Sequence, residues 1–279
     1  MASIISSTFL NSLKHLFPGF NKVDGRHGAT RMTAGVRSGD VSESPVFQNP
    51  WYIVATVVFS ASNQPEGVKY VLENVLEDLG HYHEQEDLEK QSKKLAQKMR
   101  EAIFKSGMIS GYSKVFLIDV NSLALQRMIL VVKAINSLQV LNTAIPDEWK
   151  VTEIQRDTSI SLAEYEAKGM STFRSIYGET ADSVDGLLTT IYPDLGWFSR
   201  TIAYGITYGH GETLSQLETS YTLVAALIAS DTPQQIGWHL DGAKRGGATT
   251  EEVKAIRQIS MEVAKFSGIK WKHGVPEVT

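Results

Sequence analysis

The chain has 279 residues, with 27 Lys and Arg against 31 Asp and Glu, so its formal net charge is −4. This length allows one large domain or two small ones, and 42% hydrophobic residues are enough for a globular core. Mild acidity predicts no nucleic-acid partner, short apolar runs predict no integral membrane segment, and the absence of cysteine excludes disulfides, thiolate nucleophiles and Cys-ligated metals.

Residues 1–39 are basic and poor in acids, and their apolar side chains recur at helical spacing. This pattern is typical of an organelle transit peptide, so we predict a mitochondrial protein, with the cytoplasm as the second choice. The alternative is a disordered tail with one amphipathic turn. The apolar positions are Ile5, Phe9, Leu13 and Leu16, and the basic ones are Lys14, Lys22, Arg26, Arg31 and Arg37.

From Asn49 onward, apolar residues recur three and four positions apart, which predicts an all-α fold. We expect a first, degenerate helical repeat over 45–145 and a second repeat over 155–279. Residues 81–101 are predicted to be a linker that runs into a solvated helix face.

The sequence near the C-terminus contains signals for the beginning and the end of helices. Thr232 with Gln235, and Thr249 with Glu252, have the spacing of capping boxes. Gly246-Gly247 is expected to end the helix that begins at the first of these boxes.

Two segments of the chain align with each other without a gap. Residues 61–72 match residues 229–240, with Ala, Ser, Pro and Leu identical, and residues 101–107 match residues 262–268. The match predicts two copies of one helical unit, although chance similarity of two helix–turn–helix segments is the alternative. His239 falls where the first copy has Val71, which suggests one functional and one structural copy.

The second copy carries a family resemblance. Ile176-Tyr177-Gly178, Tyr192-Pro193-Asp194-Leu195, residues 223–228 and His239-Leu240-Asp241-Gly242-Ala243 resemble the carboxymuconolactone decarboxylase and alkylhydroperoxidase D superfamily. The resemblance implies an AhpD-like all-α fold and assembly into trimers or hexamers.

The resemblance also sets limits on the chemistry. Peroxidase members of the superfamily carry a Cys-x-x-Cys pair where this chain has Thr232 and Gln235, so a thiol peroxidase is excluded. The carboxylate of that relay falls on Ser220. What remains is a lyase-like reaction without a cofactor: decarboxylation or isomerisation of a small organic acid or lactone.

We expect His239 to be the general acid or base, since an unperturbed imidazole titrates near neutral pH. Glu218, on the preceding helix, is the candidate to orient it. The structural alternatives are that His239 is a core histidine and that Glu218 is an exposed carboxylate. The other expected pocket residues, which can equally be core or capping residues, are Trp238, Tyr204, Tyr208, Ser220, Thr232 and Gln235.

No metal site is predicted, because His210 and Glu212 do not complete a ligand set with His239. The rival to the enzyme is a non-catalytic oligomeric scaffold or binding module of an organelle, favoured by the missing cysteines and by Ser220.

Overall fold

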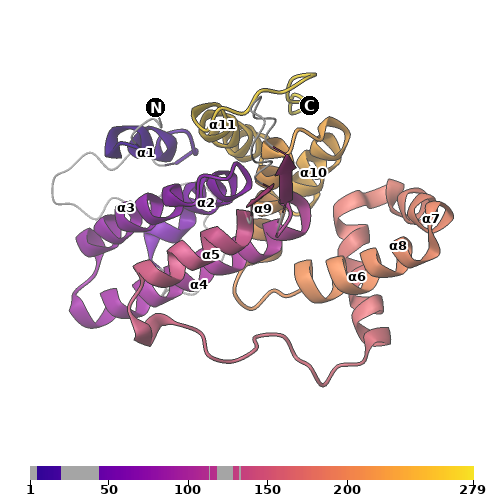
Figure 1. Cartoon of the computed structure of the whole chain (residues 1–279), viewed down its shortest axis with the longest axis horizontal. Coiled ribbons are helices and arrows are strands. Elements are labelled where there is room, and N and C mark those ends of the chain that lie inside the picture. Colours follow the sequence, from indigo (N-terminus) through magenta and orange to yellow (C-terminus); the bar gives the residue numbers. More distant parts are fainter. Residues whose placement is uncertain (1–4, 20–43, 113, 118–127, 132) are drawn as a thin grey trace.

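A computed structural model describes residues 5–19, 44–112, 114–117, 128–131 and 133–279 (Figure 1). The regular secondary structure of the described part is helical apart from one antiparallel pair of short strands, in which Lys114 pairs with Val131. The predicted all-α fold class is confirmed. The elements, in chain order, are α1 (Ser7–Lys14), η2 (Pro45–Gln48), α2 (Trp51–Ala61), α3 (Glu66–Tyr82), α4 (Gln85–Ser110), β1 (Lys114–Leu117), β2 (Met128–Val131), α5 (Lys133–Ala144), η3 (Asp147–Trp149), α6 (Leu162–Tyr177), η4 (Gly178–Thr180), α7 (Ala181–Ile191), α8 (Pro193–Phe198), η5 (Ser199–Tyr208), α9 (Gln216–Ala229), α10 (Pro233–Arg245) and α11 (Thr250–Phe266).

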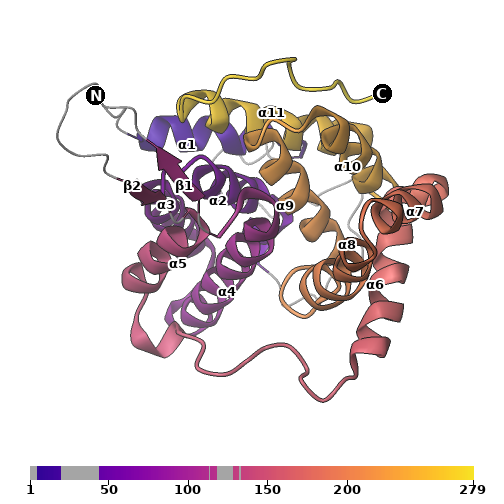
Figure 2. The ribbon, with the colours of Figure 1, turned by 45° about the vertical axis from the view of Figure 1, so that its right-hand side comes forward.

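The main core is built around α2 and α9. Every residue of α2 is buried, as is every residue of α9 from Thr219 onward. A helix that is apolar on all sides must be enclosed by others. Here α2 and α9 pack on each other, α4 packs on both, and α11 packs on both (Figure 2). Both halves of the chain therefore contribute to one core.

The two aligned segments have the same local structure. In each, a helix that ends in alanine is followed by a tight turn and a new helix that begins beside a proline. The turns place Asn63 at φ 59° and Asp231 at φ 54°, and these positions correspond in the alignment. Left-handed backbone is uncommon for residues other than glycine, and Asn and Asp tolerate it best. The matching geometry agrees with a duplicated unit.

One of the two predicted capping boxes forms. The Thr249 side chain accepts from the Glu252 amide, and the Glu252 carboxylate accepts from the Thr249 amide. The box at Thr232 is wrong: its hydroxyl donates to the Leu227 carbonyl at 3.2 Å and does not cap α10. The end of α10 is as predicted, because Arg245 is its last residue and Gly247 follows at φ 97°.

Part of the predicted targeting segment is a docked helix. Leu10 and Leu13 of α1 are 2% and 1% exposed, and the Phe9 ring stacks on Phe266 at 4.6 Å. Lys14 forms an ion pair with Asp78 of α3 at 2.6 Å. Residues 7–14 are therefore not disordered, and their amphipathic pattern matches a surface of the protein's own core.

The expected linker over 81–101 is also wrong. Only His83 and Glu84 separate α3 from α4. The face of α4 that includes Leu95 and Met99 is fully buried, so only part of this helix is solvated. The long irregular connection runs between α5 and α6, at the junction of the two predicted repeats, and η3 is its one helical turn.

A second, smaller core lies among α6, α7, η5 and α9. Helix α6 packs closely along η5, which is a ten-residue π-helix, a rare conformation that is frequent at functional sites. A Cβ added at Gly169 of α6 would lie 1.7 Å from the Arg200 carbonyl oxygen, so only glycine permits this approach. Among the described residues, no helix has both the length and the apolar composition needed to cross a bilayer.

Candidate histidine–tyrosine site

The histidine that the sequence singled out lies against the second core. His239 lies on the buried face of α10 and is 4% exposed. Its partner helix is α6: a Cβ added at Gly242 would lie 2.9 Å from the Ile176 carbonyl oxygen, so glycine lets the two helices meet. This approach places the Tyr177 hydroxyl 3.5 Å from His239 Nε2, with ring centroids 5.6 Å apart.

A chain of hydroxyl groups leads away from His239. The Tyr204 hydroxyl, on η5, donates to the Tyr177 hydroxyl at 3.1 Å. Tyr208 follows four residues later on η5, and its ring centroid lies 5.2 Å from that of Tyr204. Phe173 stacks on Tyr177 at 4.3 Å. We call His239, Tyr177, Tyr204, Tyr208 and Phe173 the histidine–tyrosine cluster.

Burial keeps the cluster uncharged at neutral pH. Desolvation, and secondarily the positive charge of Arg245, lower the pKa of His239 to about 4. Desolvation also raises the pKa of Tyr177 and raises that of Tyr204 well above its usual value. His239 is therefore a neutral imidazole at pH 7, so it can accept a proton but is not a stored source of one.

One polar atom of the cluster has no partner. His239 Nδ1 is buried and makes no hydrogen bond to any residue that the structure describes. A buried imidazole nitrogen without a partner is unfavourable by about 1–3 kcal/mol. Buried polar atoms usually have a hydrogen-bond partner, so Nδ1 is an exception in this core.

The structure brings together some of the predicted site residues. Tyr204 and Tyr208 belong to the cluster, and the half-buried Trp238 ring lies 5.8 Å from that of Tyr177. Glu218 is engaged elsewhere: its carboxylate accepts from Lys98 Nζ at 2.6 Å and from the Ser215 amide at 2.9 Å.

The remaining predicted residues have structural contacts. Ser220 is buried and donates to the Gln216 carbonyl, Thr232 donates to the Leu227 carbonyl, and Gln235 is exposed. Within the described ranges, no carboxylate is hydrogen-bonded to His239 and no group of three or more His, Asp or Glu side chains could hold a metal ion.

Sequence reasoning missed the role of Tyr177 and of Phe173. Tyr177 stood in the resembling stretch Ile176-Tyr177-Gly178 but received no role. It ends α6, 62 positions before His239, and only the helix packing brings the two together. The signal in the sequence was the spacing of Phe173 and Tyr177, which places two aromatic rings on one helical face.

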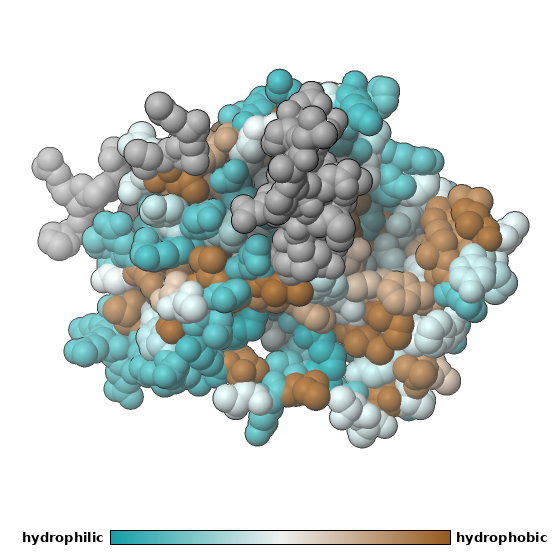
Figure 3. All heavy atoms as spheres, in the orientation of Figure 1, coloured by the Kyte–Doolittle hydropathy of each residue, from teal (hydrophilic) through white to brown (hydrophobic). Residues whose placement is uncertain are grey.

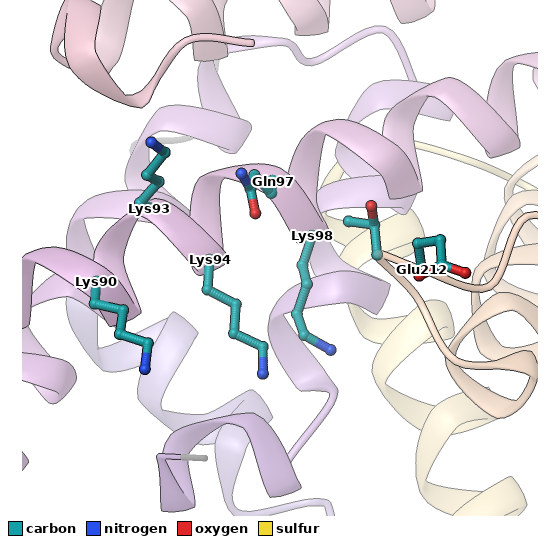
Figure 4. Close-up of a pocket in the computed structure, with 7 residues that line it drawn as sticks. Lys90, Lys93, Lys94, Gln97, Lys98 and Glu212 are labelled. Atoms are coloured by element: carbon teal, nitrogen blue, oxygen red, sulfur yellow. The ribbon is translucent and has the colours of Figure 1, made fainter. Parts of the chain in front are cut away.

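A groove of about 310 Å³ lies elsewhere, along α4 (Figure 4). None of the residues that line it belongs to the histidine–tyrosine cluster. The lining residues are Lys90, Lys93, Lys94, Gln97, Lys98, Glu212 and Thr213.

Two known proteins resemble the chain along most of its length. A protein named Peroxisomal protein 2 from Schizosaccharomyces pombe is 29% identical over 223 residues, which cover 79% of this chain and 88% of that protein. A protein of the same name from Saccharomyces cerevisiae is 25% identical over an alignment of 285 residues, which covers 83% of this chain and 93% of that protein. No protein-family model matches the chain.

These similarities overturn the predicted localisation. Both relatives are named for the peroxisome, so the mitochondrial and cytoplasmic predictions are wrong. The physical reason lies in α1: its amphipathic pattern, which suggested a transit peptide, is explained by docking on α2 and α3.

Proposed function

We propose that this chain is a carboxymuconolactone-decarboxylase-like protein of the peroxisome, with acid–base chemistry that needs no cofactor, on a small organic acid or lactone. The observation that carries the proposal is His239, which is buried, neutral, held by Tyr177 and unpartnered at Nδ1. The resembling residues suggest the reaction class, and the names of the two relatives suggest the compartment.

The proposal uses the tautomer of His239 that carries its proton on Nε2. In this tautomer Nε2 donates to the Tyr177 hydroxyl, and Nδ1 has the free lone pair that exchanges a proton with a ligand. In an isomerisation, Nδ1 takes a proton from a carbon next to a carbonyl, the C–H electron pair moves into an enolate, and the proton returns at another carbon. In a decarboxylation, CO₂ leaves, its bonding pair stays on the carbon, and one proton is taken up there.

The charge state favours isomerisation between these two. A pKa of about 4 leaves His239 unprotonated at pH 7, which is the form that begins an isomerisation, but it also makes the imidazole a weak base in the free protein. An anionic carboxylate bound beside the ring stabilises the imidazolium and raises its pKa toward the working pH. A small organic acid therefore improves the base that acts on it.

The test is proton exchange from solvent. The purified chain is incubated in D₂O with a panel of small unsaturated lactone acids, and deuterium at carbon and release of CO₂ are followed by NMR. We expect incorporation by the wild type, loss of about 100-fold or more in His239→Gln, and retention in His83→Gln, a histidine at the α3–α4 junction. Equal exchange by wild type and His239→Gln contradicts the proposal.

Localisation is tested separately. The full chain with a fluorescent tag should coincide with a peroxisomal matrix marker in cells. A diffuse signal, or coincidence with a mitochondrial marker, contradicts the proposed compartment.

Self-association is part of the same proposal. Large apolar side chains between positions 187 and 198 are exposed, and Asp194 is the one charged residue in that stretch. Figure 3 shows apolar surface on the right-hand side, where Figure 1 places α7 and α8. An exposed apolar patch of this kind marks an interaction site. Its members are Leu187, Ile191, Tyr192, Leu195, Trp197 and Phe198.

The same patch favours the second candidate function, a non-catalytic oligomeric scaffold or binding module. Light scattering on wild type and Ile191→Lys tests whether this patch is the contact between copies, because residue 191 is 64% exposed and its substitution should leave the fold intact. We expect the wild type to be a trimer or hexamer and the variant to have a lower mass. An oligomer without proton exchange on any acid favours the scaffold.

A further inference from the structure

Two cations hold the C-terminal end of the π-helix η5. Arg156 Nε and Nη2 donate to the Ile206 and Thr207 carbonyls at 3.4 and 3.5 Å. Lys105 Nζ donates to the carbonyls of Tyr208 and His210, at 3.4 and 2.7 Å. The last carbonyls of a helix have no partner within it and carry partial negative charge, so cations stabilise this end.

Glu101 orients both cations. Its carboxylate accepts two hydrogen bonds from Arg156, at 2.9 and 2.5 Å, and lies 3.8 Å from Lys105 Nζ. Lys105 makes a further hydrogen bond, to Thr219 Oγ1 of α9, at 2.8 Å. We call Glu101, Lys105 and Arg156 the clamp.

The clamp requires a charged side chain to be buried, which is unfavourable. Lys105 is fully buried, and desolvation lowers its pKa to about 8 against the opposing effect of Glu101. A charge buried in this way is a poor source of net stability, since its desolvation offsets much of the attraction it gains. These contacts instead fix the position of the carbonyl groups at the end of η5.

The repeat shows that two of the three clamp residues come from the first copy. Lys105 and Glu101 belong to α4 of the first copy, which lacks a counterpart of His239. At the position that aligns with Lys105, the second copy has Phe266, whose ring instead packs against α1 and α2. The buried lysine is thus particular to the first copy and reaches across to the helix that carries Tyr204 and Tyr208.

We propose that Lys105 and Arg156 are positioning residues for the histidine–tyrosine cluster: by holding the end of η5, they fix Tyr204 against Tyr177 and so keep the environment of His239 dry. This inference rests on the proposed function of His239. It gives the first copy a role in the site although that copy contributes no group to the chemistry.

The test compares substitutions in the full chain. Lys105→Met keeps a straight side chain but removes the cation, and Arg156→Gln removes the second one. The matched control is Lys98→Met, on the same helix as Lys105, which breaks the partly buried ion pair with Glu218 of α9 without touching η5. Arg156→Lys restores a charge and should partly restore the wild-type behaviour.

Two readouts separate positioning from stability. We expect amide hydrogen exchange in residues 199–210 to rise by about tenfold or more in Lys105→Met and Arg156→Gln. The pKa of His239, followed by NMR of the imidazole, should rise by about one unit or more as water enters. Lys98→Met should lower the melting temperature while leaving both readouts as in the wild type.

An unchanged pKa of His239 and unchanged exchange in Lys105→Met and Arg156→Gln overturn the inference. Equal changes in Lys98→Met overturn it too, because they indicate general loosening. If Lys105→Met does not fold, the comparison of Arg156→Gln with Arg156→Lys tests the inference, because Arg156 is less buried than Lys105. Neither readout measures turnover, so failure of the reaction and failure of the clamp are distinguishable.

Discussion

The buried, neutral state of His239 makes stability depend on pH in a way that can be measured. Burial lowers its pKa from 6.5 to about 4, so between these values the unfolded chain binds more protons than the folded one. The free energy of unfolding therefore rises with pH in this window and falls as the solution is acidified. This dependence on pH levels off about one pH unit above 6.5.

The magnitude follows from the same two pKa values. One pKa unit corresponds to about 1.4 kcal/mol, and most of the protonation of the unfolded histidine is complete by pH 5. Acidification from pH 7.5 to 5 should thus remove about 2 kcal/mol through His239 alone. Carboxylates also titrate at the acid end of this range, and their effect cancels when wild type and His239→Gln are compared.

The assay is urea unfolding of both proteins at pH 7.5, 6.5 and 5. We expect the stability difference between wild type and His239→Gln to shift by about 2 kcal/mol against the wild type on acidification. Trp238→Phe perturbs the same site without removing a titrating group, so its difference from wild type should stay constant. A constant difference for His239→Gln as well refutes the reasoning, because it means that the imidazole is hydrated in the folded chain.

Three further predictions concern packing and helix ends. Gly169→Ala should lower the free energy of unfolding by about 3 kcal/mol or more, whereas Gly186→Ala, with nothing near its Cβ, should raise it by about 0.5–1 kcal/mol, both by chemical denaturation. Leu13→Ala should cost about 3 kcal/mol and expose α1 to proteolysis, while Leu16→Ala, already 38% exposed, should cost less than about 0.5 kcal/mol. Thr249→Ala should cost about 1 kcal/mol through the lost capping box, and an unchanged melting temperature would contradict that assignment.

The fold class could be predicted because helix formation and helix capping depend on residues that are close together in the sequence. Val253, Ile256 and Val263 recur at helical spacing and are buried, and Thr249 caps the helix that it precedes. Thr232 has the same spacing but a backbone at φ −117° and ψ 73°, so its hydroxyl is used within the preceding turn. Spacing alone does not distinguish these geometries.

The site depends on contacts that no local pattern contains. Tyr177 and His239 meet because Gly242 lets α6 approach α10, and Lys105 reaches η5 from a helix more than a hundred positions earlier in the chain. Periodicity also cannot tell which surface an amphipathic helix covers. The apolar face of α1 therefore suggested a targeting signal, although Leu13 is buried in the protein's own core.

The central claim is that His239 Nδ1 exchanges a proton with a bound small organic acid. The most direct measurement is the ¹⁵N NMR spectrum of the His239 ring at pH 7, with and without a lactone acid that supports exchange. We predict a neutral ring held at Nε2 in the free protein, and protonation at Nδ1 with a pKa raised by about one unit or more in the complex. A ring whose spectrum and pKa stay the same when the acid binds would contradict the claim.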